Sequence, residues 1–308
     1  CKINPCGGGG CDPVVNMLGK AITLRSIAGP SVTIMDALQS NHVILCDSFE
    51  GTDTIIDGFT ITGGSALNGG GLNCNESSPT IINCIFDSNS AEFGGGVRCY
   101  SGSPTITNCT FTENTSSWSG GAIYCWSYSN PTITNCTFTA NTATKYGGAI
   151  EITWNSDGVV EDCIFTANVA NELGGAVIAS HTVDITNSTF IGNITNNRGS
   201  AIFHSGGYEN EISTISNCTI SANSSSNNGG AVYCGRNITI DSCAISSNQG
   251  GGVYINNDTK DPPFLSNSVI CGNDAFQINN NNWVEGENVC LAYSCDDNDQ
   301  DGMPDKCQ

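Results

Sequence analysis

The sequence predicts an all-β fold, a right-handed parallel β-helix (β-solenoid) of about ten coils with terminal caps. Two short motifs alternate along the chain at intervals of about 25 residues, and such a period indicates a solenoid or array. Inside each motif the residues alternate with a period of two, which places successive side chains on opposite faces of a strand. The repeats are rich in Thr, Ile, Val, Phe, Asn and Gly, which favour strands and turns over helices.

The first motif reads Asn-Cys-x-Phe-x-x-Asn, and its copies or close variants begin at Asn83, Asn108, Asn135, Asp162 and Asn187. From Cys84 to Ser268 its equivalent positions are 25, 27, 27, 25, 30, 25 and 25 residues apart. Asn tolerates the left-handed bend between two strands, and stacked Asn side chains can hydrogen-bond from coil to coil.

The second motif reads Gly-Gly-[Ala/Gly]-[Ile/Leu/Val], and its copies begin at Gly69, Gly94, Gly120, Gly147, Gly174, Gly199 (as Gly-Ser-Ala-Ile), Gly229 and Gly250. The two series advance together, so each coil holds one copy of each motif. Gly-Gly supplies a second bend where a Cβ atom does not fit.

The pattern divides the chain into three parts. Residues 1–54 are expected to form an N-terminal cap and early coils, because an open solenoid end exposes unpaired strand edges. Residues 55–290 are expected to form the β-helix, and residues 291–308 an acidic C-terminal loop.

The composition restricts the partners and the location. A net charge of −20 repels nucleic acid and anionic membranes, so nucleic acid is excluded as a partner. No apolar run of about 20 residues is present, so no membrane-spanning segment is expected. The chain has 18 cysteines and no Cys-x-x-Cys pair, which favours an oxidising, extracellular or cell-surface location.

Several cysteines recur at one inward position of the repeat. Stacked positions lie about 4.8 Å apart, within the Cα separation that a disulfide accepts. Disulfides between neighbouring coils are one interpretation, and ladders of small buried thiols are the other. The candidate disulfide cysteines are Cys84, Cys109, Cys136, Cys163, Cys218 and Cys243, with Cys295 and Cys307 flanking the C-terminal loop.

The C-terminal loop alternates acidic residues and then places a glycine at Gly302. Such a turn can wrap carboxylates around one calcium ion, which takes six or more oxygen ligands. The candidate ligands are the side chains of Asp297, Asp299, Asp301 and Asp305 and the backbone carbonyl of Met303. The motif resembles a thrombospondin type 3 or dockerin-like calcium loop, although it lacks the glutamate at the twelfth position of an EF-hand. A solvated acidic tail is the alternative.

The two repeat motifs together resemble the repeats of chlamydial polymorphic membrane proteins, over about residues 55–275. They also resemble the wider group of right-handed parallel β-helix proteins that share the pectin-lyase-like fold. The resemblance implies the fold, but it leaves function open. The relatives include adhesins, surface passenger domains and enzymes that degrade polysaccharides.

The outward positions that follow Gly-Gly carry a stripe of large side chains. Such a stripe marks a contact surface for a glycan or a protein, unless side loops cover it. It consists of Tyr124, Ile178, Phe203, Tyr233 and Tyr254. No two neighbouring outward positions in this row pair one Asp with another, an arrangement that a hydrolase of this fold needs.

Ten Asn-x-Ser/Thr sequons occur in the chain. Those in the Asn-Cys-Thr turn are expected to be buried bends. The candidate glycosylation sites, expected on exposed loops, are Asn75, Asn114, Asn193, Asn223 and Asn257.

These observations favour a non-catalytic extracellular structural or adhesive surface module. It would bind a glycan, a surface protein or further copies of itself in a fibre, with calcium as its cofactor. The alternative is a carbohydrate-active enzyme of the same fold, either a polysaccharide lyase or a glycoside hydrolase.

Overall fold

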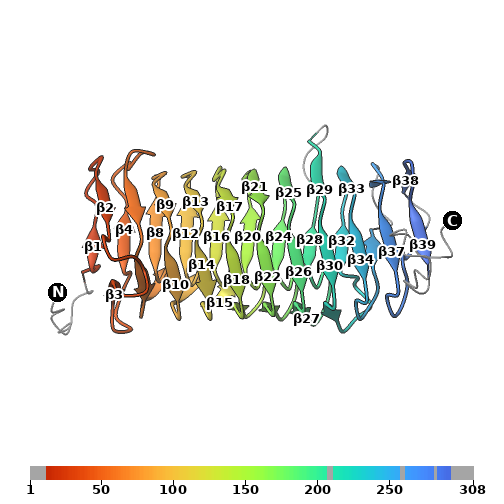
Figure 1. The fold of residues 1–308 in the computed structure, drawn as a ribbon, viewed down its shortest axis with the longest axis horizontal. Helices are drawn as coiled ribbons and strands as arrows, with labels where there is room; N and C mark the ends of the chain where they lie inside the picture. The colour runs from red at the N-terminus through yellow and green to blue at the C-terminus, as the bar shows by residue number, and fades with distance from the viewer. Residues whose placement is uncertain (1–11, 207–210, 257–260, 281–282, 293–308) are drawn as a thin grey trace.

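The computed structural model describes residues 12–206, 211–256, 261–280 and 283–292. Within these residues the chain forms 39 short strands and no helix, and the strands of successive coils pair in parallel (Figure 1). The all-β solenoid prediction is therefore confirmed. Two of the sheets hold eleven strands each, so the rod has about eleven coils rather than ten. At about 4.8 Å a coil, they span about 50 Å.

Four parallel sheets run along the rod. Sheet A contains, in stacking order, β1 (Val15–Asn16), β4 (Ile44–Cys46), β8 (Leu72–Asn75), β12 (Val97–Tyr100), β16 (Ile123–Trp126), β20 (Ile150–Thr153), β24 (Val177–Ala179), β28 (Ile202–His204), β32 (Val232–Cys234) and β35 (Val253–Ile255). Sheet B contains β2 (Thr23–Arg25), β5 (Ile55–Asp57), β9 (Thr80–Ile82), β13 (Thr105–Thr107), β17 (Thr132–Thr134), β21 (Gly158–Glu161), β25 (Val183–Thr186), β29 (Ser213–Ser216), β33 (Ile238–Asp241), β36 (Phe264–Ser266) and β38 (Val284–Glu285).

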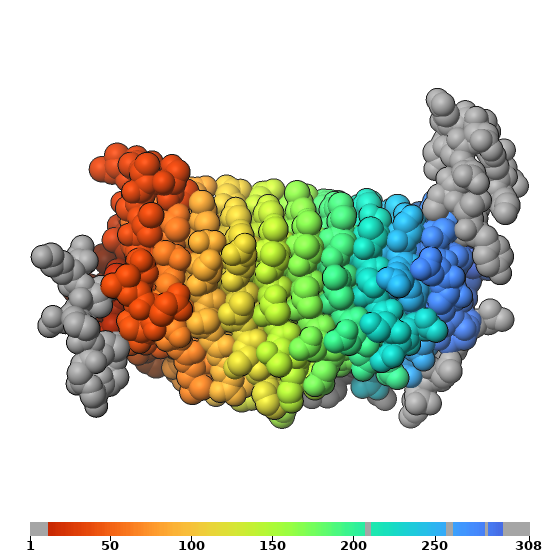
Figure 2. Space-filling model, turned by 90° about the horizontal axis from the view of Figure 1, so that it is seen from below, coloured from red at the N-terminus to blue at the C-terminus, as the bar shows by residue number. Residues whose placement is uncertain are grey.

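Sheet C contains β3 (Ile34–Asp36), β6 (Thr60–Thr62), β10 (Ile85–Asp87), β14 (Thr110–Thr112), β18 (Thr137–Thr139), β22 (Ile164–Thr166), β26 (Thr189–Ile191), β30 (Thr219–Ser221), β34 (Ala244–Ser246), β37 (Val269–Cys271) and β39 (Cys290–Ala292). The short sheet D contains β7 (Ser65–Asn68), β11 (Ser90–Phe93), β15 (Thr115–Ser119), β19 (Thr142–Ala143), β23 (Val169–Ala170), β27 (Ile194–Thr195) and β31 (Ser224–Ser225). Each coil passes through the sheets in turn, and in the space-filling view successive coils lie side by side as narrow slabs (Figure 2).

The stacked coils begin early in the chain. In sheet B, Thr23 pairs with Ile55, and in sheet A, Cys46 pairs with Cys74, so strands before residue 55 already lie in register with the coils that follow. At the other end, Val269 pairs with Cys290 in sheet C.

A column of phenylalanines fills the interior behind sheet C. Phe86, Phe111, Phe138, Phe165 and Phe190 have no exposed surface. Their ring centroids lie 4.8, 4.9, 4.8 and 4.6 Å apart and the planes of neighbouring rings differ by no more than 7°. The spacing of the rings equals the spacing of the strands, so the phenylalanine of the repeat packs on its own copy in the next coil.

A ladder of asparagines runs beside the phenylalanine column. Asn168 shows its geometry: its Oδ1 accepts from the backbone N–H and the Nδ2 of Asn141 at 3.0 and 2.9 Å. Its own Nδ2 donates to Phe138 O at 3.0 Å and to Asn193 Oδ1 at 2.9 Å. Both donors and both acceptor positions of the amide are thereby used, which removes the cost of burying it. The ladder consists of Asn89, Asn114, Asn141, Asn168, Asn193, Asn223, Asn248 and Asn273.

The ladder corrects three of the proposed glycosylation sites. Asn114, Asn193 and Asn223 were expected on exposed loops, but they have no exposed surface because their amides are ladder members. Asn75 is half-buried, and Asn257 lies outside the described residues.

The burial of the Asn-Cys-Thr sequons also differs from the expectation. Asn108 and Asn135 are exposed rather than buried, with φ of 54° and 52°. They form the left-handed bend, and the bend turns their side chains outward while the following cysteine points inward. The exposed sequons of this row are Asn108, Asn135, Asn187 and Asn217.

The second bend requires glycine. Gly120 has φ of 62°, and a Cβ atom there would lie 2.4 Å from Ile123 O. The neighbouring Gly121 has no room for a Cβ atom either, because Gly148 O of the next coil would lie 2.1 Å from it. The Gly-Gly pair therefore allows each coil to turn tightly against the next one.

The repeated cysteines are buried free thiols, so the prediction of disulfides between neighbouring coils is wrong for them. Cys109 is typical: its Sγ lies 3.3 Å from Thr107 O and 3.7 Å from Ile81 O, so the S–H group is directed at backbone carbonyls. The same state holds for Cys84, Cys109, Cys136, Cys163, Cys218 and Cys243. Cys295 and Cys307 lie outside the described residues.

Two cysteines that sequence reasoning did not single out, Cys271 and Cys290, each take part in a disulfide. They lie near the C-terminal end of the rod, in β37 and β39. Among the described residues, disulfide bonding is thus found at the C-terminal end of the rod and not among the stacked cysteines of the repeats.

Replacing one ladder asparagine tests the role of the ladder. We expect Asn168→Ala to lower the free energy of unfolding by at least about 3 kcal/mol, because it leaves Asn141 N, Asn141 Nδ2 and Phe138 O without partners in the interior. The matched control is Asn171→Ala, at an exposed position three residues away, with an expected change within about 0.5 kcal/mol. Urea denaturation followed by circular dichroism measures both, and equal losses would contradict a stabilising ladder.

Candidate functional site

The outer face of sheet A carries one continuous column of side chains, here called the outward row. Register pairing connects each member to the next, so residues about 25 positions apart in the sequence lie on neighbouring strands. The row runs Asn73, Arg98, Tyr124, Glu151, Ile178, Phe203, Tyr233 and Tyr254. All five residues of the predicted contact stripe lie in this row.

A second column, the turn row, flanks the outward row just before the Gly-Gly bend. It consists of Asn68, Phe93, Ser119, Tyr146, Leu173 and Arg198. Because these residues belong to the same bends in successive coils, their side chains lie along the edge of the outward row.

The turn covers part of the predicted stripe, which corrects two of its members. Ile178 and Tyr233 are each only 4 % exposed. The bend at Gly174 lies directly against the Ile178 side chain, and the guanidinium of Arg198 lies 5.3 Å from the centre of the Tyr233 ring. Tyr233 is also stacked between Phe203 and Tyr254, with centroids 4.5 and 5.3 Å away. These two side chains are therefore packing residues rather than a contact surface.

The outward row is open near its N-terminal end, where a cavity of about 220 Å³ lies between the two rows. Phe93, Tyr124 and Trp126 provide its aromatic walls, and Arg98 and Asn68 provide its polar groups. These residues come from four strands: β7, β11, β12 and β16. Of the predicted stripe, only Tyr124 lines this cavity.

Further aromatic side chains surround the cavity. The Trp126 ring lies 5.2 Å from that of Tyr100 and 5.7 Å from that of Trp154. On the opposite side the Phe93 ring lies 5.1 Å from that of Tyr124. Trp154 is 66 % exposed, so the aromatic cluster continues from the cavity to the open surface.

Sequence reasoning had not placed Asn68, Phe93 or Arg98 in a site. The available signal was their fixed position in the repeat. Asn68 and Phe93 come directly before Gly-Gly, and Arg98 occupies the outward position after it. The cavity itself follows from side-chain sizes in three neighbouring coils, which no single repeat reveals.

Glu151 occupies the next position of the outward row after Tyr124. It is 8 % exposed, and its Oε2 has no hydrogen-bond partner among the described residues. Burial raises the pKa of the Glu151 carboxyl to about 7, against a hydrogen bond from Ser119 that lowers it. Burial, followed by the charge of Glu151, raises the pKa of Tyr124, so its phenol stays protonated.

This carboxyl is not arranged for glycoside hydrolysis. Its neighbours in the outward row are Tyr124 and Ile178, so no second carboxylate stands beside it there. Hydrolases of sugars use two carboxyl groups on either side of the bond that breaks. Its small exposed fraction also keeps a substrate away from the carboxyl.

The buried carboxyl predicts a pH dependence of stability that Glu151→Gln removes. The folded-state pKa of about 7 lies above the ordinary value of 4.5. The contribution of the neutral carboxyl to protein stability is therefore fully present below pH 4.5 and is lost as the pH rises through 7. Between pH 4.5 and pH 8 we expect the free energy of unfolding of the variant to rise by about 3 kcal/mol relative to the wild type.

Urea titrations at several pH values measure this difference. Glu113→Gln, at an exposed position, is the control and should follow the wild type at every pH. Parallel wild-type and Glu151→Gln profiles would contradict a carboxyl that is neutral in the folded state.

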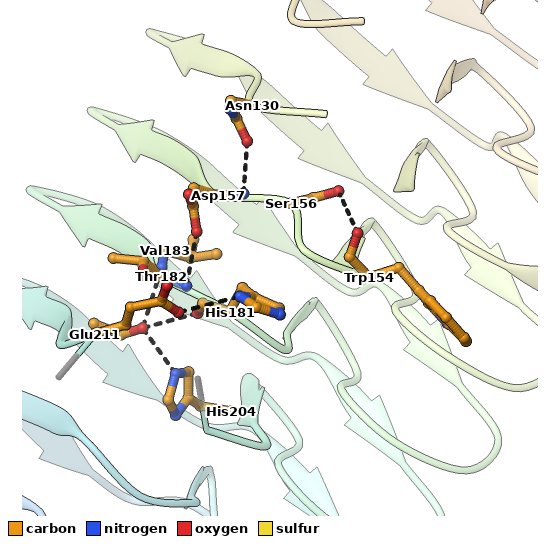
Figure 3. A network of polar contacts seen from close by, with 10 residues as sticks. Asn130, Trp154, Ser156, Asp157, His181, Thr182, Val183, His204 and Glu211 are labelled. Atoms are coloured by element: carbon orange, nitrogen blue, oxygen red, sulfur yellow. Dashed lines mark hydrogen bonds and ion pairs between the residues drawn. The ribbon is translucent and has the colours of Figure 1, made fainter. Parts of the chain in front are cut away.

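A second buried polar cluster lies further along the rod, around His204 and His181 (Figure 3). His204 Nε2 lies 2.8 Å from Ser213 Oγ, and both residues are 1 % exposed. Next to them, His181 Nδ1 lies 3.3 Å from Glu211 Oε2. On the neighbouring turns, the side chains of Asn130 and Asp157 each accept a backbone N–H from the following coil, at 2.9 and 3.2 Å.

The Ser213–His204 pair has the spacing of a nucleophile and its base, but its protons are placed differently. Val183 N–H donates to Ser213 Oγ at 3.1 Å, and the hydroxyl donates its only proton to His181 O at 3.0 Å. The hydroxyl can then only accept from His204, so His204 Nε2 carries a proton and donates it. A protonated Nε2 cannot act as the base for Ser213. The pair connects coils rather than forming a catalytic dyad.

Burial lowers the pKa of His204 to about 4, against a hydrogen bond to the His181 backbone that raises it. In the unfolded chain the imidazole takes up a proton below its ordinary value of 6.5, so stability is lost as the pH falls from 6.5 to 4. We expect His204→Gln to remove a loss of about 3 kcal/mol over this range. Urea denaturation at pH 7 and pH 4 measures the difference between variant and wild type, because Glu151 changes the wild-type stability in the opposite direction over this range. His42→Gln, at a half-buried position, should change with pH as the wild type does. A His204→Gln variant whose stability changes with pH as that of the wild type does would contradict the assignment.

The predicted calcium site cannot be placed. Asp297, Asp299, Asp301, Met303 and Asp305 lie outside the described residues, and the calcium loop stays a prediction. Within the described part of the chain, no group of three or more His, Cys, Asp or Glu residues is arranged to hold a metal ion. The same part contains no helix long and apolar enough to cross a membrane.

Two family models match the chain. Residues 70–208 match the model of the right handed beta helix region, which gives the hand of the stacked coils. The chain is a right-handed parallel β-helix. Residues 217–235 of the β-helix match the Chlamydia polymorphic membrane protein repeat, which indicates a repeat of the surface-protein type. No curated protein and no solved structure matches the chain.

Proposed function

We propose that this β-helix is a non-catalytic, surface-displayed adhesive module that holds a glycan in the aromatic cavity beside Tyr124. The observation that carries the proposal is the cavity itself, which three aromatic side chains wall on the outer face of a rigid sheet. Among the described residues, large side chains cover the neighbouring part of the outward row, so this opening is a feature of the fold that its repeats do not require.

Aromatic walls suit a sugar ring. Tyr and Trp offer flat apolar faces and a polar edge, and binding pockets combine such faces with a few polar groups that fix orientation. Here Asn68 and Arg98 supply the polar groups. The residues stand on strands whose positions are determined on both sides by neighbouring coils, so the cavity is formed before the ligand arrives.

Display outside the cell is the setting that the repeat match supports. A rod of stacked coils holds its lateral cavity at a set distance from its ends, which suits adhesion. Calcium binding by the C-terminal loop and self-association into a fibre remain predictions that belong to the same setting.

The alternative function, carbohydrate cleavage, has less support. Glu151 has a pKa near the working range of a general acid, but it is covered and has no carboxylate beside it in its row. A cavity that binds without cleaving fits the arrangement better.

A glycan microarray probed with labelled protein tests the proposal. We expect wild-type protein to bind a subset of the glycans, and Trp126→Ala to weaken that binding by at least about tenfold, because Trp126 forms a wall of the cavity. Tyr128→Ala is the matched control, since Tyr128 is 66 % exposed two residues away and does not line the cavity. Circular dichroism of all three proteins confirms that they fold alike.

Equal binding by both variants, or no binding by wild-type protein, would contradict the proposal. Release of reducing ends or unsaturated products from bound polysaccharide would favour the enzyme instead.

A further inference from the structure

Arg98 is the one lining side chain of the cavity that carries a full charge, and it has no counter-charge in an ion pair among the described residues. Its Nη1 donates one long hydrogen bond of 3.4 Å to Asn73 Oδ1. Its Nε is buried and has no hydrogen-bond partner in the part of the chain that the structure describes. Within the described residues Arg98 forms no ion pair, whereas Arg25 pairs with Asp57.

The lack of an ion pair at Arg98 is unusual for a chain with this composition. The chain has 29 acidic residues against 9 basic ones, so carboxylates are plentiful, yet the charged or ionisable groups that act on Arg98 are thiols and phenols. Burial lowers the pKa of the Arg98 guanidinium, which expresses the cost of removing it from water. A partly desolvated charge is stabilised when an anion reaches it, and a carboxylate matches the planar guanidinium best.

The remaining walls define what accompanies the carboxylate. Tyr100 lies beneath the guanidinium, 5.1 Å from it, and Phe93, Tyr124 and Trp126 enclose the space in front. The cavity of about 220 Å³ is smaller than the ~300–1,000 Å³ that enclose a drug-sized ligand. It therefore takes one ring-sized group with apolar faces.

We propose that the cavity binds a single acidic sugar ring, with its carboxylate on Arg98 and its ring faces against the aromatic walls. This inference rests on the proposed function and names the class of ligand. Asn68 Nδ2 and Oδ1 offer one donor and one acceptor to a ring hydroxyl at the cavity edge.

The net charge restricts the ligand further. A chain of net charge −20 repels a polyanion along its length, whereas a neutral glycan that ends in one acidic sugar meets the unpaired guanidinium alone. The ligand is thus an acidic terminal unit rather than a run of acidic units.

Pairs of small probes that differ only in the acid test the inference on the full chain. The probes are the methyl glycosides of glucuronic, galacturonic and mannuronic acid with those of glucose, galactose and mannose, and the methyl glycoside of N-acetylneuraminic acid with its methyl ester. Isothermal titration calorimetry and ligand-observed NMR measure the affinities. We expect at least one acid to bind about tenfold or more tightly than its neutral partner, and the preference to weaken as salt is raised.

The variants identify the residue. We expect Arg98→Gln to reduce the preference for the acid to about one while binding of the neutral partner stays, and Arg98→Lys to retain part of the preference. Arg198→Gln is the matched control, because it removes the same charge from the neighbouring turn row and should leave the preference intact. Thermal unfolding of each variant checks that it is folded.

The outcomes separate the two proposals. If neutral sugars bind as tightly as acids, or if Arg98→Gln keeps the preference, the inference fails and the glycan-binding function stands. If no sugar binds, both fail. Binding of a short peptide through its terminal carboxylate, with no sugar bound, would also overturn the inference and indicate a protein partner. Tighter binding of polygalacturonate than of any single acidic glycoside would overturn the restriction to one acidic unit.

Discussion

The structure depends on one constraint: each coil hydrogen-bonds to the next in the same parallel register. A side chain therefore lies about 4.8 Å from its own equivalent on either side. Residues that pack or bond well with copies of themselves are favoured at interior positions. Phe111 stacks on Phe138, and Asn141 satisfies its amide on Asn168. The cysteines fit the same rule as small apolar residues whose S–H groups meet backbone carbonyls.

On the outer surface of the β-helix the same register produces columns of side chains whose members can differ from coil to coil. Where the turn row and the outward row both carry large side chains, the surface closes, as at Ile178 and Tyr233. Beside Arg98 the two rows leave a gap that aromatic rings border. The site is therefore a departure from the repeat, set on a scaffold that repetition makes rigid. This separation lets the surface change residue by residue while the hydrogen-bonded interior stays the same.

Charged and ionisable side chains that are buried cost free energy unless they are paired, so those in the interior are informative. His204 is tied into a Ser213 network that uses every proton and fixes which imidazole nitrogen carries one. Among the residues that the structure describes, Glu151 lacks a hydrogen-bond partner for Oε2, and Arg98 lacks one for Nε. The Ser213–His204 pair connects coils and is structural, although His204 Nδ1 is buried with no hydrogen-bond partner among the described residues. Arg98 differs because its side chain lines a cavity that a ligand can enter.

The sequence by itself determined the solenoid, its period, and the inward position of residues such as Cys109 and Phe111, because local alternation and repeat spacing encode these features directly. It did not separate the two kinds of asparagine: Asn114 is inside and Asn108 outside, although both begin a sequon. Only the tertiary structure decided that, since the direction of each side chain depends on which residue takes the left-handed bend. It also decided the free state of the thiols and the cavity at Arg98. These depend on contacts between coils, and such contacts follow from side-chain size and direction rather than from period.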